Sequence, residues 1–83
     1  MSEHITVISK NNCQACIATK RYLEQEGHKF IELNIESEIN KDKADQIVGS
    51  LKMHGFQGLP VVLVDDDWET AFSGFRPDKL KLL

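Results

Sequence analysis

The sequence is poor in cysteine and contains no long apolar run. It has only two cysteines, Cys13 and Cys16, among 83 residues. Small secreted proteins held together by disulfides devote more than about 8–10% of their residues to cysteine, so the chain is not one of these. The longest strongly apolar run, Leu59–Val64, is far shorter than the roughly 18 residues that a membrane span requires, so no membrane segment is expected.

Basic residues are also in short supply. Ten lysines and arginines stand against thirteen aspartates and glutamates, which gives a formal net charge of −3. Nucleic-acid-binding proteins depend on neutralising phosphates, so no nucleic-acid partner is expected. The N-terminal residues Met1–His4 lack the basic and apolar segments of a secretion signal. These features together predict a cytoplasmic protein, which we expect to be a monomer.

The rest of the composition is that of an ordinary globular protein, with 41% hydrophobic and 28% charged residues. The length predicts one domain, residues 1–83. Apolar patterns predict strands at 5–8, 30–35, 61–64 and 68–72, and helices at 13–26, 44–51 and 77–83. We expect Gly27 to follow the end of the first helix and Pro77 to begin the last. The order β-α-β-α-β-β-α predicts an α/β fold, a mixed sheet with helices on both faces.

The segment Cys13-Gln14-Ala15-Cys16 carries the clearest chemistry, because it joins the first strand to the first helix. Residues at i and i+3 of a helical turn have Cβ atoms about 5–6 Å apart, within reach of a disulfide after a small adjustment. Free N–H groups and the dipole at the helix start would stabilise a Cys13 thiolate. Cys16 lies one turn further on, facing the core, which suits a resolving thiol.

Other uses of this cysteine pair leave requirements unmet. A zinc site needs four ligands; with His28 as the third, another histidine is expected at about residues 32–34, which are Glu32, Leu33 and Asn34. Haem attachment needs a histidine directly after the second cysteine, where this chain has Ile17. Two ordinary buried cysteines remain an alternative, and no metal is expected.

Pro60 is the second informative residue. It precedes a strand that we expect to be central, where proline is normally excluded because it has no N–H. A cis Leu59–Pro60 bond in a tight turn would remove the conflict, and a trans proline at the first strand position would do so equally. Lys10, three residues before Cys13, either favours the thiolate or is simply solvated.

Three segments together resemble those of NrdH-redoxins, the glutaredoxin-like electron donors of class Ib ribonucleotide reductase. They are Cys13-Gln14-Ala15-Cys16, Leu59-Pro60-Val61-Val62 and Ser73-Gly74-Phe75-Arg76-Pro77-Asp78, of which the last is the most specific. The resemblance covers essentially the whole chain and implies a thioredoxin/glutaredoxin-like fold, with a four-stranded mixed sheet and three helices. The chain departs from the family at Phe72, where tryptophan is usual, so any indole hydrogen bond there is absent.

The resemblance implies a thiol–disulfide oxidoreductase in which Cys13 is the nucleophile and Cys16 the resolving cysteine. It also implies a cis Pro60 beside them, and the exposed backbone of Leu59 could then pair with an extended partner segment. No cofactor would be bound. Electrons would come from NADPH through thioredoxin reductase and pass to the large subunit of ribonucleotide reductase.

Ser73, Gly74, Phe75, Arg76 and Pro77 are expected to form a segment that determines partner specificity. Gly74 would permit close backbone approach, and Pro77 would fix the start of the last helix. Phe75 would be an exposed apolar contact and Arg76 would pair with a partner's carboxylate. The alternative places Phe75 in the core, with Arg76 tying the last helix to the sheet.

Two other functions remain open. A glutathione-dependent glutaredoxin is the first, although Gln14-Ala15 replaces the usual Pro-Tyr, and Ser73-Gly74-Phe75 replaces a Gly-Gly-type glutathione contact. A non-enzymatic, thioredoxin-like module that senses redox state and binds a partner is the second.

Overall fold

The structure, a computed structural model, describes residues 4–83 and has the predicted order of elements. Each element lies within a few residues of its expected position. The elements are β1 (Ile5–Ser9), α1 (Gln14–Gln25), β2 (Phe30–Asn34), a 3-10 turn η1 (Glu38–Asn40), α2 (Lys41–Met53), β3 (Val61–Val64), β4 (Asp67–Ser73) and α3 (Pro77–Leu80).

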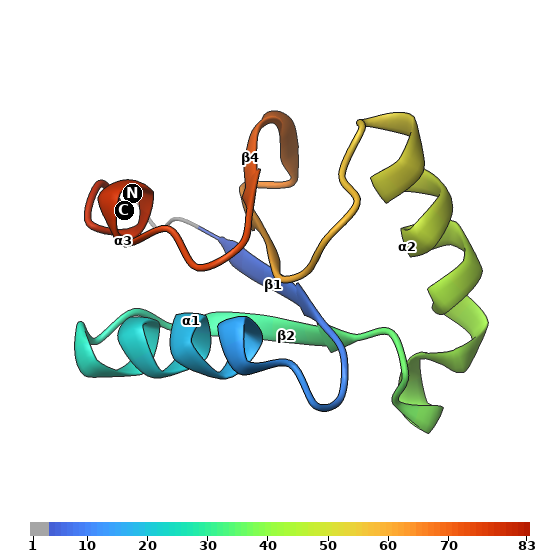
Figure 1. The fold of residues 1–83 in the computed structure, drawn as a ribbon, viewed down its shortest axis with the longest axis horizontal. Helices are drawn as coiled ribbons and strands as arrows, with labels where there is room; N and C mark the ends of the chain where they lie inside the picture. The colour runs from blue at the N-terminus through green and yellow to red at the C-terminus, as the bar shows by residue number, and fades with distance from the viewer. Residues whose placement is uncertain (1–3) are drawn as a thin grey trace.

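The four strands form one mixed sheet in the order β2-β1-β3-β4 (Figure 1). β1 runs parallel to β2 and antiparallel to β3, and β3 is antiparallel to β4. The two central strands are buried along almost their whole length, as expected for β-branched strands covered on both faces. The predicted α/β architecture is therefore confirmed.

The helices divide between the two faces of the sheet, as predicted: α1 and α3 cover one face and α2 the other (Figure 1). Each face has its own buried cluster, to which the sheet and the covering helices contribute. The α1/α3 face holds Ile5, Val7, Leu23, Val62, Phe72 and Leu80. The α2 face holds Ile8, Leu51, Val61 and Leu63, with Ile35, Ile47, Phe56, Leu59, Trp68 and Ala71 packed against them.

The ends of the helices follow local chemistry. Gly27, just after α1, has φ +76°, a left-handed conformation that glycine adopts without steric cost. Pro77 begins α3, as predicted. However, α3 ends at Leu80 rather than Leu83. Leu80 is fully buried and Leu82 is 79% exposed, while Leu83 is half-buried and packs against the same core cluster as Leu80.

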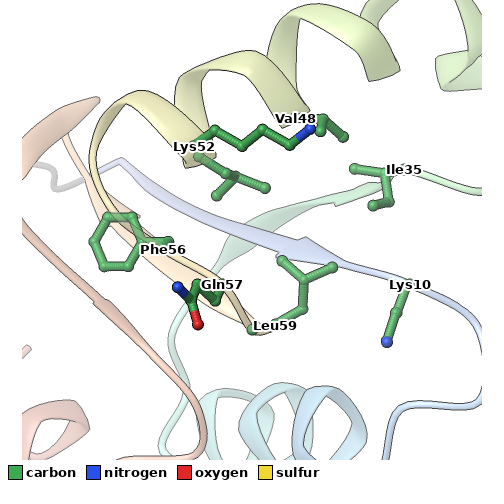
Figure 2. Close-up of a pocket in the computed structure, with 9 residues that line it drawn as sticks. Lys10, Ile35, Val48, Lys52, Phe56, Gln57 and Leu59 are labelled. Atoms are coloured by element: carbon green, nitrogen blue, oxygen red, sulfur yellow. The ribbon is translucent and has the colours of Figure 1, made fainter.

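The connection from α2 to β3, residues 54–60, brings the chain back to the start of α1. Figure 2 shows Phe56, Gln57 and Leu59 along it, between α2 and the sheet. The N–H of Phe56 donates to the carbonyl of Leu51 at 2.8 Å, which ties the connection to the end of α2. Within residues 4–83, none of the helices has the length and apolar character needed to cross a membrane.

Candidate active site

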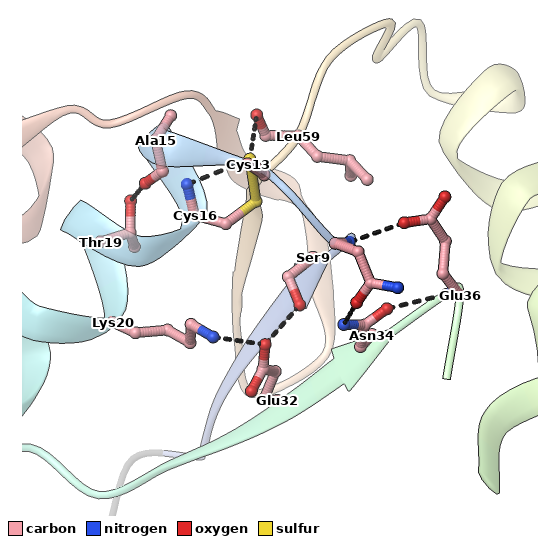
Figure 3. The surroundings of a disulfide bond; sticks show 11 residues. Ser9, Cys13, Ala15, Cys16, Thr19, Lys20, Glu32, Asn34, Glu36 and Leu59 are labelled. Atoms are coloured by element: carbon pink, nitrogen blue, oxygen red, sulfur yellow. Dashed lines mark hydrogen bonds and ion pairs between the residues drawn. A yellow bond between two sulfur atoms is a disulfide. The ribbon is translucent and has the colours of Figure 1, made fainter. Parts of the chain in front are cut away.

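Cys13 and Cys16 form a disulfide at the start of α1 (Figure 3), with their Cα atoms 5.2 Å apart. The sequence placed Cys13 inside the helix, but it is the residue before it, with extended backbone at φ −118° and ψ 104°. Cys16 lies in the first helical turn. The N-cap position matters because the side chain there faces the unpaired N–H groups of the first turn.

The two sulfur atoms lie in different surroundings. The backbone N–H of Cys16 donates to Sγ of Cys13 at 3.1 Å. Cys13 is 8% exposed and Cys16 is 1% exposed, so the first cysteine lies nearer to solvent and the second faces the core. This asymmetry is what a nucleophile and a buried resolving thiol require.

The Leu59–Pro60 bond is cis, which settles the choice that the pattern left open. The carbonyl oxygen of Leu59 lies 3.7 Å from Sγ of Cys13 (Figure 3), although the two residues are 46 positions apart in the sequence. Pro60 itself is buried. The fold therefore brings the cysteine pair and the proline turn together, as the sequence analysis expected.

The segment Ser73–Asp78 reaches the same region through a backbone contact. The N–H of Gly74 donates to the carbonyl of Pro60 at 2.8 Å. Gly74 has φ +82°, and a Cβ added there would meet nothing within 4 Å. No atom of this chain therefore needs the space that a side chain at Gly74 would occupy, and close approach by a partner's backbone stays a prediction. Glycine is favoured there because of its left-handed backbone conformation.

Phe75 and Arg76 lie on the surface. Phe75 is 39% exposed, so it is not a core residue. The guanidinium of Arg76 donates to both carboxylate oxygens of Asp78, at 3.2 Å from Nε and 3.1 Å from Nη2. These hydrogen bonds hold the pKa of Asp78 below its ordinary value. Among its described contacts, Arg76 pairs with the first turn of α3 and not with the sheet.

A polar cluster behind the cysteines was missed from the sequence. The hydroxyl of Ser9, which is fully buried, donates to Oε2 of Glu32 at 2.6 Å, and Nζ of Lys20 contacts the same oxygen at 2.7 Å (Figure 3). Partial burial raises the pKa of Glu32, but the hydrogen bonds from Lys20 and Ser9 and the charge of Lys20 outweigh it. The net pKa of Glu32 therefore lies below its ordinary value.

The only sequence signal for this cluster was that Ser9 follows the apolar run Ile5–Ile8 of the first strand. A buried hydroxyl needs a hydrogen-bond partner. That partner, Glu32, lies on the neighbouring strand and Lys20 on the covering helix, so only the assembled sheet shows the group.

Phe72 is buried on the α1/α3 face, and Nζ of Lys79 lies 5.9 Å from the centre of its ring. Trp68 packs on the opposite face, where it stacks on His54 with ring centres 4.8 Å apart. The pairing of β3 with β4 shifts register between Val62 and Val64, which places these two side chains of one strand on opposite faces. Trp68 therefore does not replace the tryptophan that the family usually has at position 72.

Within residues 4–83, histidine, cysteine, aspartate and glutamate side chains form no group of three or more that could hold a metal ion. The family model described as Glutaredoxin matches residues 5–68. The chain belongs to the glutaredoxin family. A glutaredoxin-family chain with a redox-active CxxC pair is a thiol–disulfide oxidoreductase, so that prediction is confirmed.

Curated relatives place the chain in the NrdH branch of the glutaredoxin family. The glutaredoxin-like protein NrdH of Salmonella typhimurium is 40% identical over 79 residues, which cover 95% of this chain and 86% of the relative. The NrdH protein of Lactococcus lactis subsp. cremoris is 39% identical, covering 95% of this chain and 97% of the relative. The resemblance seen in the sequence is thus confirmed.

Solved structures agree with this placement. The NrdH-redoxin of Escherichia coli, described as a glutaredoxin-like protein with a thioredoxin-like activity profile, matches with a TM-score of 0.79 and 36% identity, over 96% of this chain and 93% of the other. A glutaredoxin from Archaeoglobus fulgidus matches with a TM-score of 0.73 at 22% identity, over 95% of this chain and 83% of the other, which shows the shared fold.

Proposed function

We propose that this glutaredoxin-family protein carries electrons from NADPH-dependent thioredoxin reductase to the large subunit of a class Ib ribonucleotide reductase. The observation that carries the proposal is the position of Cys13, which caps α1 with its sulfur accepting an N–H, beside the cis Leu59–Pro60 turn. The identity to NrdH proteins supports the choice of partners.

The reduced protein acts first through Cys13. Its thiolate attacks one sulfur of the partner's disulfide, so a Cys13–partner disulfide forms while the partner's other sulfur leaves as a thiolate and takes up a proton. The N–H of Cys16, which donates to Sγ of Cys13 at 3.1 Å in the disulfide, would stabilise the attacking thiolate. The carbonyl oxygen of Leu59, 3.7 Å from the same sulfur in the disulfide, would partly offset this stabilisation.

Cys16 completes the exchange. Its thiol loses a proton and attacks Sγ of Cys13, forming the Cys13–Cys16 disulfide and releasing the second partner sulfur as a thiolate. Two electrons have then passed to the partner, and the second partner thiolate takes up a proton from solvent, which replaces the one that Cys13 gave to solvent when it ionised. Thioredoxin reductase returns two electrons from NADPH, so the protein itself needs no bound cofactor. The proposal includes a cytoplasmic location, because a dithiol carrier needs a compartment that keeps thiols reduced.

Glutathione as the reductant is the second candidate, because the family model that matches residues 5–68 is that of the glutaredoxins. Two observations favour thioredoxin reductase instead. The similar Escherichia coli protein is described as having a thioredoxin-like activity profile. This chain also has Gln14-Ala15 and Ser73-Gly74-Phe75 where glutathione-dependent members have different residues.

Trapping the mixed disulfide tests the proposed exchange. Cys16→Ser, mixed in its reduced form with the oxidised large subunit of a class Ib ribonucleotide reductase, is expected to accumulate a covalent complex through Cys13. The attacking thiol remains in this variant, and the thiol that would release the partner is gone. Non-reducing electrophoresis and peptide mass spectrometry measure the complex.

Cys13→Ser is the matched control for this trap and is expected to give no complex. A complex that forms through Cys16 in Cys13→Ser, at the rate seen for Cys16→Ser, would reverse the two roles. If neither variant forms a complex with the large subunit while both are folded, the proposed partner is wrong.

A further inference from the structure

The loop of residues 10–12 carries the chain from the end of β1 to Cys13. Asn12, directly before Cys13, has φ +55°, so its backbone is left-handed. L side chains rarely adopt this conformation, although asparagine tolerates it better than most. A residue stays in such a conformation only where the surrounding structure holds it. The contacts that hold this loop therefore help to fix the position of Cys13.

Two hydrogen bonds hold the loop at Asn11. Its backbone N–H donates to Oε1 of Glu36 at 2.7 Å, and its side-chain oxygen accepts from Nδ2 of Asn34 at 3.0 Å. Asn34 is the last residue of β2, and Glu36 follows two positions later. Figure 3 shows both side chains beside the loop that leads from Ser9 to Cys13. The loop before α1 is thus fastened to the end of the neighbouring strand.

Asn34 and Glu36 are themselves held in place. Oδ1 of Asn34 accepts the N–H of Glu36 at 2.8 Å, which leaves the amide nitrogen of Asn34 for Asn11. The N–H of Ile35, between them, donates to the carbonyl of Ser9 at 2.9 Å. The two side chains therefore present a fixed donor and a fixed acceptor to the loop. We call Asn34 and Glu36 the loop clamp.

The loop clamp matters most once the disulfide is reduced. In the disulfide, the bond to Cys16 holds Sγ of Cys13, which accepts the N–H of Cys16 at 3.1 Å. Reduction breaks this bond, and the backbone before the helix must then keep the sulfur at the same N–H. A mobile thiol loses conformational freedom when it ionises there, and this cost disfavours the thiolate. If the backbone is already held, much of that cost falls away.

We propose that Asn34 and Glu36 are positioning residues for disulfide exchange: by holding Asn11, they keep the reduced Cys13 at the N-terminus of α1, in the geometry that stabilises its thiolate. The inference rests on the proposed exchange at Cys13. It adds two residues whose effect on the ionisation of Cys13 is transmitted through the loop backbone.

The loop clamp lies at the surface, which separates this role from a purely structural one. Asn11 and Glu36 are exposed, so water replaces their hydrogen bond when it breaks, and its net contribution to the stability of the domain is small. Loss of the clamp is therefore expected to change the ionisation of Cys13 while Tm stays nearly constant. A purely structural contact would lower Tm and leave the ionisation unchanged.

The test follows the alkylation of the reduced protein by iodoacetamide as a function of pH, with the rate at Cys13 taken from peptide mass spectrometry. Glu36→Ala removes the acceptor of the Asn11 N–H, whereas Glu36→Gln keeps an oxygen there. Both variants lack the charge of Glu36, so their difference isolates the clamp. At a given pH, the thiolate-to-thiol ratio of Cys13 is expected to be about two- to tenfold lower in Glu36→Ala than in Glu36→Gln.

Asn34→Ala is the second variant, and it leaves the net charge unchanged. It removes the donor to Asn11 and the acceptor that holds Glu36, so we expect the ratio to fall below that of the wild type. Glu38→Ala is the matched control, because Glu38 is an exposed carboxylate of η1 outside the clamp. It should leave the ratio within about twofold of the wild type. Thermal unfolding of each oxidised variant supplies its Tm.

Equal ratios in Glu36→Ala and Glu36→Gln, or no fall in Asn34→Ala, would overturn the positioning role while the exchange stands. A lowered Tm with an unchanged ratio would also overturn it, because the clamp would then be only structural. Reduced wild-type protein mixed with oxidised 2-mercaptoethanol, a small neutral disulfide, tests the exchange separately. If the wild type does not reduce this disulfide, the proposed exchange itself fails.

Discussion

Cys13 and Cys16 show how far the surroundings of a residue can differ over a single helical turn. Cys13 precedes the helix and its sulfur accepts the N–H of Cys16, whereas Cys16 is 1% exposed and faces the core. A thiolate is stabilised at the first position and penalised by burial at the second. At the scale of the residue, these different surroundings support the proposed order of reaction, in which the sulfur of Cys13 attacks first and that of Cys16 second.

The Ser9–Glu32–Lys20 cluster predicts a pH-dependent contribution to stability. Replacing Glu32 by Gln keeps an oxygen that can accept from the Ser9 hydroxyl but removes the charge that attracts Lys20. Because the pair is partly exposed, we expect Glu32→Gln to lower the free energy of unfolding at pH 7 by about 0.2–1 kcal/mol.

The pKa of Glu32 is lower in the folded protein than its ordinary value, so the charged form stabilises the fold. This contribution is present at neutral pH and is lost as the pH falls below about 4.3, through the lower pKa of the folded protein. Urea unfolding of wild type and Glu32→Gln is measured from pH 7 to pH 3. The difference in the free energy of unfolding between the two proteins should shrink as the pH falls. Lys20→Met should have the same pH dependence, and a difference that stays constant with pH would contradict this account.

At the scale of the element, local pattern predicted the parts of the fold that depend on local chemistry. The apolar runs Ile5–Ile8 and Val61–Val64 became the two central strands, and Gly27 and Pro77 lie at the helix boundaries where the sequence placed them. Each of these features depends on the residue itself and its immediate neighbours in the chain.

Residue patterns alone did not predict features that depend on distant contacts, and only the resemblance to NrdH-redoxins placed Pro60 beside the cysteines. β2 is an edge strand, which leaves its apolar Ile31 48% exposed. Trp68 and Phe72 lie on opposite faces of the sheet because the pairing of β3 with β4 shifts register between Val62 and Val64. The residues of the strand itself do not indicate this shift. The cysteine pair and Pro60 could be singled out from the sequence, but the contact of Cys13 with Leu59 needs the assembled sheet.

The segment Ser73–Asp78 yields a prediction for partner specificity. Arg76 is exposed and pairs only with Asp78 among its described contacts, so Arg76→Ala is expected to leave Tm and the reactivity toward oxidised 2-mercaptoethanol nearly unchanged. If the guanidinium meets a carboxylate of the partner, kcat/KM with thioredoxin reductase should fall by about two- to fivefold.

Asp78→Ala is the matched variant, because it frees Arg76 without removing the guanidinium. We expect it to retain or raise kcat/KM with the reductase. An equal loss in both variants would show that the Arg76–Asp78 pair acts by fixing the start of α3. A lowered Tm with unchanged partner kinetics in Arg76→Ala would reject the specificity role.

At the scale of the whole molecule, the fold brings three separate parts of the chain to one end of the sheet. The start of α1, the turn at Pro60 and the segment after β4 are joined there by the Cys13–Leu59 contact and the Gly74–Pro60 hydrogen bond. The sulfur chemistry and the surfaces proposed for partner recognition therefore lie in one region. A protein with this arrangement is suited to exchange electrons by direct contact with larger proteins.

The choice of reductant tests the central claim most directly. Oxidation of NADPH is followed by absorbance with a protein disulfide as the acceptor, once with thioredoxin reductase and once with glutathione and glutathione reductase. We expect turnover with thioredoxin reductase that requires this protein and is lost in Cys13→Ser, and no turnover above background with glutathione. Efficient turnover with glutathione, and none with thioredoxin reductase, would contradict the account and identify a glutathione-dependent glutaredoxin.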